Sequence, residues 1–124
     1  MIGAELQKQI FSVLQAVLPN SVFDNPPEKP VFPYITIGDE QTLDDGNSCS
    51  DGWEIFTDVH IWSRPEKGSK KEVKDLRAQV FQAVLTITEA GGQKFVAVSL
   101  DSSRVLRDPD GLTEHAVLTF RFLT

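Results

Sequence analysis

Hydrophobic side chains recur at helical spacing near the start of the chain. The apolar residues between positions 4 and 18 follow one another at three- and four-residue steps, which places them on one face of a helix; they are Leu6, Ile10, Val13, Leu14 and Val17. Pro19 disfavours helical geometry at Leu18. The pattern therefore predicts an amphipathic helix over residues 4–18.

A second helical pattern begins near residue 69. Ser69 and Glu72 have the spacing of a capping box, in which each side chain bonds a backbone N–H of the first helical turn. An apolar stripe follows, made of Val73, Leu76, Val80, Ala83, Val84 and Ile87, and Gly91–Gly92 is expected to end the helix. Phe81 and Leu85 lie beside this stripe. The apolar face is therefore wider than contact with one sheet requires.

Alternating side chains predict strands in much of the remaining chain. In residues 53–62 one face carries Trp53, Ile55, Thr57, Val59 and Ile61, and the other carries Glu54, Phe56, Asp58, His60 and Trp62. The first face is the better core candidate. Residues 95–107, with a bulge expected near 101–103, and residues 113–123 flank a turn at 108–111, so we expect an antiparallel hairpin. Ala116, Leu118, Phe120 and Phe122 share one face of its second strand.

The stretch from residue 20 to residue 52 is less regular. Residues 22–23 are a candidate for a short strand, residues 25–30 contain three prolines, and residues 32–37 are apolar and β-branched, which predicts another strand. Residues 38–52 contain five acidic residues and no basic residue. This composition predicts a long, mobile loop, and loops of this length are often functional or disordered.

The order of these elements, α-β-β-β-α-β-β, predicts an α+β fold: a mainly antiparallel sheet with two helices packed on one face. A length of 124 residues fits one domain. We find no linker, internal repeat or low-complexity tract, so we expect residues 1–124 to form a single domain.

Charge and cysteine content narrow the possible partners. The formal net charge is −6, which disfavours binding to DNA phosphates because that requires clustered Lys and Arg. A single cysteine, Cys49, allows no internal disulfide and no zinc motif. The sequence lacks a signal-peptide pattern, and no apolar run approaches the roughly 18 residues of a spanning helix. We therefore expect the chain to remain in a cytoplasm, or in a particle assembled there.

Searches for catalytic or metal-binding chemistry yield weak candidates. The sequence contains no phosphate-binding glycine loop, GxSxG, HExxH or CxxC motif. His60 and His115 lie in predicted strands and could pair as ligands or as acid and base. Two ordinary strand histidines are the favoured interpretation, because the spacing fixes no third ligand. Acidic neighbours disfavour a Cys49 thiolate, and a calcium loop beginning at Asn47 is rejected because Cys49 would occupy a ligand position.

Two surface features are candidates for contacts with other proteins. Basic residues cluster at the start of the second helix and could meet an acidic partner, including the 38–52 segment of a neighbouring copy; they are Lys67, Lys70, Lys71, Lys74 and Arg77. A solvated helix face is the simpler interpretation. Trp53 is expected in the core, whereas Trp62, on the more polar strand face, is a candidate interface anchor.

Three segments in order resemble one family. They are Pro33-Tyr-Ile-Thr-Ile-Gly-Asp-Glu40, Asp58-Val-His-Ile-Trp-Ser-Arg64 and Arg104-Val-Leu-Arg-Asp-Pro-Asp-Gly-Leu-Thr-Glu-His115, all after an amphipathic helix. In this arrangement the chain resembles the tail completion proteins of tailed bacteriophages, also called tail terminators or head–tail joining proteins. The resemblance covers nearly the whole chain.

The resemblance implies a structural protein of a phage or prophage. It implies a ring, usually of six copies, that ends the tail tube at the head-proximal side and contacts the tail-tube protein and the head–tail connector. DNA would pass through without specific binding, and no membrane, cofactor, metal or catalytic residue is implied. The expected location is the virion tail, after assembly in the host bacterial cytoplasm.

Our candidate interface residues combine the acidic segment, the basic cluster and exposed aromatic or apolar side chains. They are Tyr34, Asp39, Glu40, Asp44, Asp45, Trp62, Arg64, Lys70, Lys71, Lys74, Phe81 and Leu85. Two alternatives stay open. One is a small cytoplasmic ligand-binding or enzymatic domain that uses His60 and His115, and the other is a cytoplasmic adaptor unrelated to phage.

Overall fold

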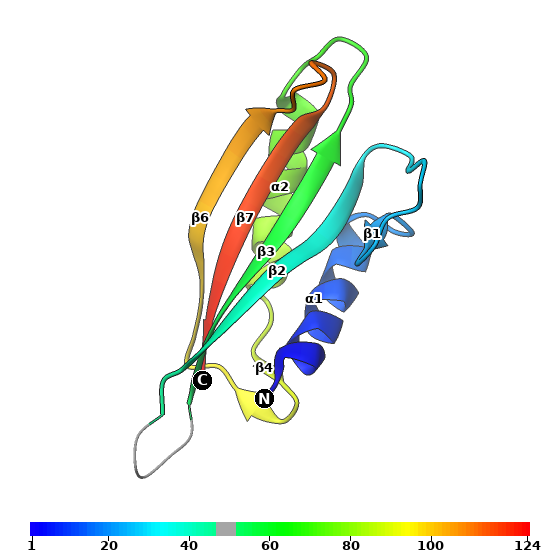
Figure 1. The fold of residues 1–124 in the computed structure, drawn as a ribbon. Coiled ribbons are helices and arrows are strands. Elements are labelled where there is room, and N and C mark those ends of the chain that lie inside the picture. Colours follow the sequence, from blue (N-terminus) through cyan, green and yellow to red (C-terminus); the bar gives the residue numbers. More distant parts are fainter. Residues whose placement is uncertain (47–51) are drawn as a thin grey trace.

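Among the described residues, a five-stranded sheet and two helices form two layers. The computed structural model describes residues 1–46 and 52–124, so Cys49 and the rejected calcium motif lie outside the described residues. Figure 1 shows helix α1 (Gly3–Val17) and helix α2 (Lys71–Val84) on the same face of the sheet. This arrangement confirms the predicted α+β fold and the predicted order of its elements.

Among the described residues, the main sheet has five strands in the order β1-β2-β3-β7-β6. Their bounds are β1 Val22–Phe23, β2 Tyr34–Asp44, β3 Trp53–Ser63, β6 Ala97–Arg107 and β7 Glu114–Leu123. β1 pairs with β2 in parallel, and the other neighbours are antiparallel. The two short strands β4 (Glu89–Ala90) and β5 (Gln93–Lys94) form a separate hairpin.

The core lies between the helices and the facing side of the sheet. On β3, Ile55, Val59 and Ile61 are buried, as the alternation predicted, and on β7 the four predicted residues from Ala116 to Phe122 are buried too. Helix α1 contributes Leu6, Ile10 and Leu14, and α2 contributes Val73, Leu76, Val80 and Val84. Each fully buried aliphatic side chain stabilises the fold by about 1.5–3 kcal/mol, so this layer of contacts holds the domain together.

The hairpin at the C-terminus also forms as predicted. The Asp108 N–H donates to the Thr113 carbonyl over 2.8 Å, and Gly111 adopts a φ of 72°, which glycine accepts readily. The register shifts between Leu100 and Ser102, so the expected bulge near residues 101–103 is confirmed.

The prediction of a loop over residues 38–52 is wrong for its first half. Strand β2 continues to Asp44, and its residues Glu40 to Asp44 pair with Thr57 to Trp53 on β3. A register shift lies between Ile37 and Glu40. Pairing with the long strand β3 outweighs the weak strand preference of these polar residues, because strand preference depends strongly on neighbouring strands.

The predicted ends of the second helix need correction as well. The helix ends at Val84, and Gly91 and Gly92, with φ of 56° and 81°, form the β4–β5 turn instead. The capping box does not form: the Ser69 hydroxyl accepts from the Lys71 N–H, whereas Glu72 accepts from the Ser63 hydroxyl at 2.6 Å. Glu72 thus ties α2 to the end of β3 rather than to its own first turn.

A buried carboxylate joins three elements at this end of the sheet. Glu114, the first residue of β7, is 0% exposed. Its Oε1 accepts from Arg107 Nε at 2.6 Å, and its Oε2 lies 3.0 Å from Lys70 Nζ. Arg107 Nη2 also donates to the Gly68 carbonyl. Burial alone would raise the pKa of Glu114, but the bonds from Arg107 and Lys70 outweigh it and hold that pKa below its ordinary value.

We predict that Arg107→Met lowers the free energy of unfolding by about 1–3 kcal/mol, because it leaves a buried carboxylate short of a donor. Lys67→Met, at an exposed position in the neighbouring loop, is the matched control and should change stability by less than about 0.5 kcal/mol. Urea unfolding at pH 7 measures both. The difference in stability between Arg107→Met and the unmodified protein should shrink as the pH falls below about 4.5, the ordinary carboxyl pKa, since protonation removes the charge of Glu114.

Candidate assembly interface

A row of stacked rings crosses the sheet face that the helices leave uncovered. Tyr34 on β2, Trp62 on β3 and His115 on β7 are cross-strand partners, and they alternate with the buried residues of the same strands. The Trp62 and His115 ring centroids lie 3.7 Å apart with planes within 12°, and the Tyr34 and Trp62 centroids lie 6.1 Å apart. We call Tyr34, Trp62, His60 and His115 the aromatic row.

The two histidines of the aromatic row bond each other. His60 Nδ1 and His115 Nε2 lie 2.8 Å apart, so one ring N–H donates to the other ring nitrogen. Burial lowers the pKa of both imidazoles below the ordinary value of 6.5, and the carboxylates of Asp58 and Asp108 only partly oppose this. Two imidazolium rings could not share this hydrogen bond, because both facing nitrogens would be donors, so the geometry disfavours a second positive charge on the pair.

Further contacts anchor Trp62 and surround the aromatic row. Trp62 Nε1 donates to the Thr36 hydroxyl at 3.1 Å, and the Arg64 guanidinium lies 4.4 Å from the centroid of Phe32. Arg64 also donates to Thr113 and pairs with Asp110 at 3.2 Å. Of the predicted interface residues in this region, Tyr34 is only 9% exposed, and Trp62 and Arg64 already have partners within the chain. Their role in an interface stays a prediction.

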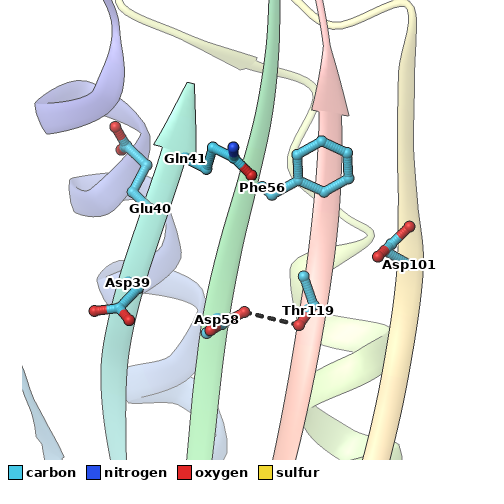
Figure 2. A pocket seen from close by; sticks show the side chains of 7 residues that line it. All are labelled: Asp39, Glu40, Gln41, Phe56, Asp58, Asp101 and Thr119. Carbon is cyan, nitrogen blue, oxygen red and sulfur yellow. Dashed lines mark hydrogen bonds between the residues drawn. The ribbon is translucent and has the colours of Figure 1, made fainter. Parts of the chain in front are cut away.

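Acidic side chains gather on the same sheet face, farther along the strands. Figure 2 shows Asp39, Asp58 and Asp101 around a hollow that Gln41, Phe56 and Thr119 also line. Asp58 accepts from the Thr119 hydroxyl at 2.7 Å. Glu40 borders the hollow as well, but its carboxylate lies beside Gly3, where it complements the positive N-terminal end of α1.

The structure separates the predicted basic cluster into two groups. Lys70 is bound to the buried Glu114, and Lys71 pairs with Asp75 one helical turn away. Lys74 and Arg77 instead border a groove between α2 and β6, which Phe81 also lines. Leu85 is half-buried near the C-terminal end of α2. The sequence could not distinguish these groups because the partner of Lys70 is 44 positions away in the chain.

The remaining predicted residues lie where β2 ends. Asp44 and Asp45 are exposed, and Leu43, before them, is an exposed apolar side chain that the sequence analysis did not select. The Asp44 carboxylate accepts from the Gly46 N–H at 2.9 Å, and the Asp45 N–H donates to the Gly52 carbonyl at 2.9 Å. These bonds order the backbone where β2 ends, and the two exposed carboxylates make this end of the β2–β3 pair acidic.

Residues 1–46 and 52–124 contain no group of three or more side chains arranged to hold a metal ion. Over the same residues, neither helix combines the length and the apolar character needed to cross a bilayer.

We predict that the free energy of unfolding falls as the pH drops from 7.5 to 5. Unfolded imidazoles take up protons near pH 6.5, whereas the folded pair resists protonation, so the unfolded state binds more protons in this interval. Urea unfolding at several pH values measures the slope. His115→Gln should flatten it, and an unchanged slope in this variant would show that another group is responsible.

Gly38 makes room for the aromatic row. A Cβ at this position would lie 2.7 Å from His60 Nε2, so we predict that Gly38→Ala lowers the free energy of unfolding by about 1–3 kcal/mol through overpacking. In a His60→Ala background the same substitution should cost much less. Equal costs in both backgrounds, measured in a double-mutant cycle, would contradict this explanation.

Comparison with known proteins identifies the family to which the chain belongs. The family model described as tail completion protein gp17 matches residues 11–124. The tail completion protein gp17 of Bacillus phage SPP1 is 31% identical over 124 residues, which covers 94% of this chain and 90% of that protein.

Solved structures agree on the fold. The structure of bacteriophage SPP1 gp17 superposes with a TM-score of 0.63 at 27% identity, and the match covers 98% of this chain and 89% of that one. A chain in the virion of a native gene transfer agent particle reaches a TM-score of 0.79 at 18% identity, over 97% of this chain and 91% of the other; it shows the fold alone. The resemblance inferred from the three sequence segments is confirmed. The chain belongs to the tail completion protein gp17 family and is a structural component of a virion tail.

Proposed function

We propose that this protein forms a ring of identical subunits that ends the tail tube at its head-proximal side and joins it to the head. The observation that carries the proposal is the family match over residues 11–124. The expected partners are further copies of the chain, six in the assembled ring, together with the tail-tube protein and the head–tail connector protein.

Two open strand edges support the formation of a ring. Within the described residues, β6 is the last strand of the sheet, and the two-residue β1 pairs with only Ile35 and Thr36 of β2. The β2 segment from Glu40 to Asp44 therefore has a neighbour, β3, on one side only. Open edges invite pairing with other chains, and contacts between two different sides of a subunit close into rings when the rotation allows.

The charge of the uncovered sheet face supports a passage for DNA without specific binding. Asp39, Asp58 and Asp101 lie on this face, and the whole chain has a net charge of −6. Carboxylates repel phosphates, and tight DNA binding needs Lys and Arg clusters. We therefore propose that a surface of this kind lets DNA move past.

One observation favours the alternative of a ligand-binding or enzymatic domain, since His60 and His115 lie together as that hypothesis required. However, each ring uses one nitrogen to bond the other, and the hollow beside His60 is open. Family membership favours a structural role instead. The adaptor alternative has no observation in its favour.

We predict that particles lacking this protein have tails of abnormal length or tails detached from heads, because nothing would end the tube or connect it. Electron microscopy of particles from a deletion strain, with and without the gene supplied in trans, measures tail length and head attachment. Normal, head-joined tails in the deletion strain would refute the proposed role.

A further inference from the structure

The groove between α2 and β6 has the character of a docking site. It has a volume of about 320 Å³, and Phe81, Leu100 and the buried Leu118 are among the residues that line it. Lys74 and Arg77 line it too. Arg77 donates to the Ser103 hydroxyl at 3.2 Å, and Lys74 forms no ion pair with any residue in the described part of the chain. The groove therefore offers an apolar surface beside positive charge.

The end of β2 has the complementary character. Leu43 is 41% exposed, and Asp44 and Asp45 follow it directly. No basic residue occurs between Tyr34 and Gly46. An apolar side chain next to two carboxylates matches in chemistry an apolar groove next to two cations.

A single chain cannot bring these two surfaces together. The strand order separates β2 from β6 by β3 and β7, a distance of about 14 Å at the usual spacing between strands. The groove also lies on the helix side of β6, at the opposite edge of the sheet from β2 (Figure 1). The β2 end of a second copy can reach the groove, and this contact joins two different sides of the subunit.

We propose that Leu43 of one copy packs into the α2–β6 groove of the next copy, which brings the acidic end formed by Asp44 and Asp45 beside Lys74 and Arg77. The inference rests on the proposed ring, and it specifies which surfaces close that ring. Because each copy offers one acidic end and one basic groove, the contact repeats in one direction around the ring.

Cross-linking in assembled particles tests this contact. The variant for this test carries Cys49→Ser, which removes the native thiol, together with Asp44→Cys and Lys74→Cys at two exposed positions. A short bismaleimide should join these cysteines between copies and give a ladder that extends beyond dimers on a denaturing gel. The matched control pairs Asp44→Cys with Lys8→Cys, at an exposed position on α1, and should give no ladder.

Each outcome distinguishes the contact from the ring itself. Particles that contain the chain but give no ladder, or that give an equal ladder with the control pair, would overturn the contact and leave the ring standing. Cross-links to a different virion protein would show that the groove serves another partner, which also overturns it. If particles made with the unmodified chain contain no copy of it, the proposed function is refuted as well.

Charge reversal provides an independent test. Lys74→Glu with Arg77→Glu should lower incorporation into particles about tenfold, because like charges would face each other. Adding Asp44→Lys and Asp45→Lys to the same chain should restore incorporation. Lys8→Glu with Lys29→Glu changes the net charge equally and should leave incorporation within about twofold of the unmodified chain. If the variant with all four substitutions folds normally but its incorporation into particles does not recover, the proposed charge pairing is contradicted.

Discussion

The packing of both helices against the same side of the sheet is the constraint on which the rest of this structure depends. One side of each strand must supply the core, and the other side faces away from the helices. In a strand successive side chains point to opposite sides, so every buried residue of β3 is followed by one on the uncovered face. The aromatic row and the acidic hollow both occupy that face, which no third layer covers in the part of the chain that the structure describes.

Much of the fold could be predicted because its signals are local. The spacing of Leu6, Ile10 and Leu14 requires one helix face, and the alternation in β3 and β7 assigns their buried sides. The errors occurred where a distant partner decides the structure. Residues 40–44 lack strand preference, yet they pair with β3, and Glu72 bonds Ser63 instead of its own helix terminus. The secondary-structure preference of a short segment carries no information about partners that lie far away in the sequence.

The candidate site was less predictable for the same reason. The sequence identified Trp62 and raised a pairing of His60 with His115, but the stacking of these rings depends on the registers of β3 with β2 and β7, which set Trp62 opposite both Tyr34 and His115. Likewise, Glu114 gave no sign of burial, because its two cations come from Lys70 and Arg107 on other elements. The family resemblance was recognisable earlier, since it rests on short segments in order and needs no geometry.

The brevity of β1 has a consequence for how an assembly of this chain would build up. Strand β1 pairs with β2 only at Ile35 and Thr36. A strand added by another copy could therefore pair with the five residues from Glu40 to Asp44. A pairing this short holds two subunits weakly, and the joint becomes durable when several such joints act together. Incomplete or misaligned circles would fall apart and rebuild, whereas a completed circle would persist.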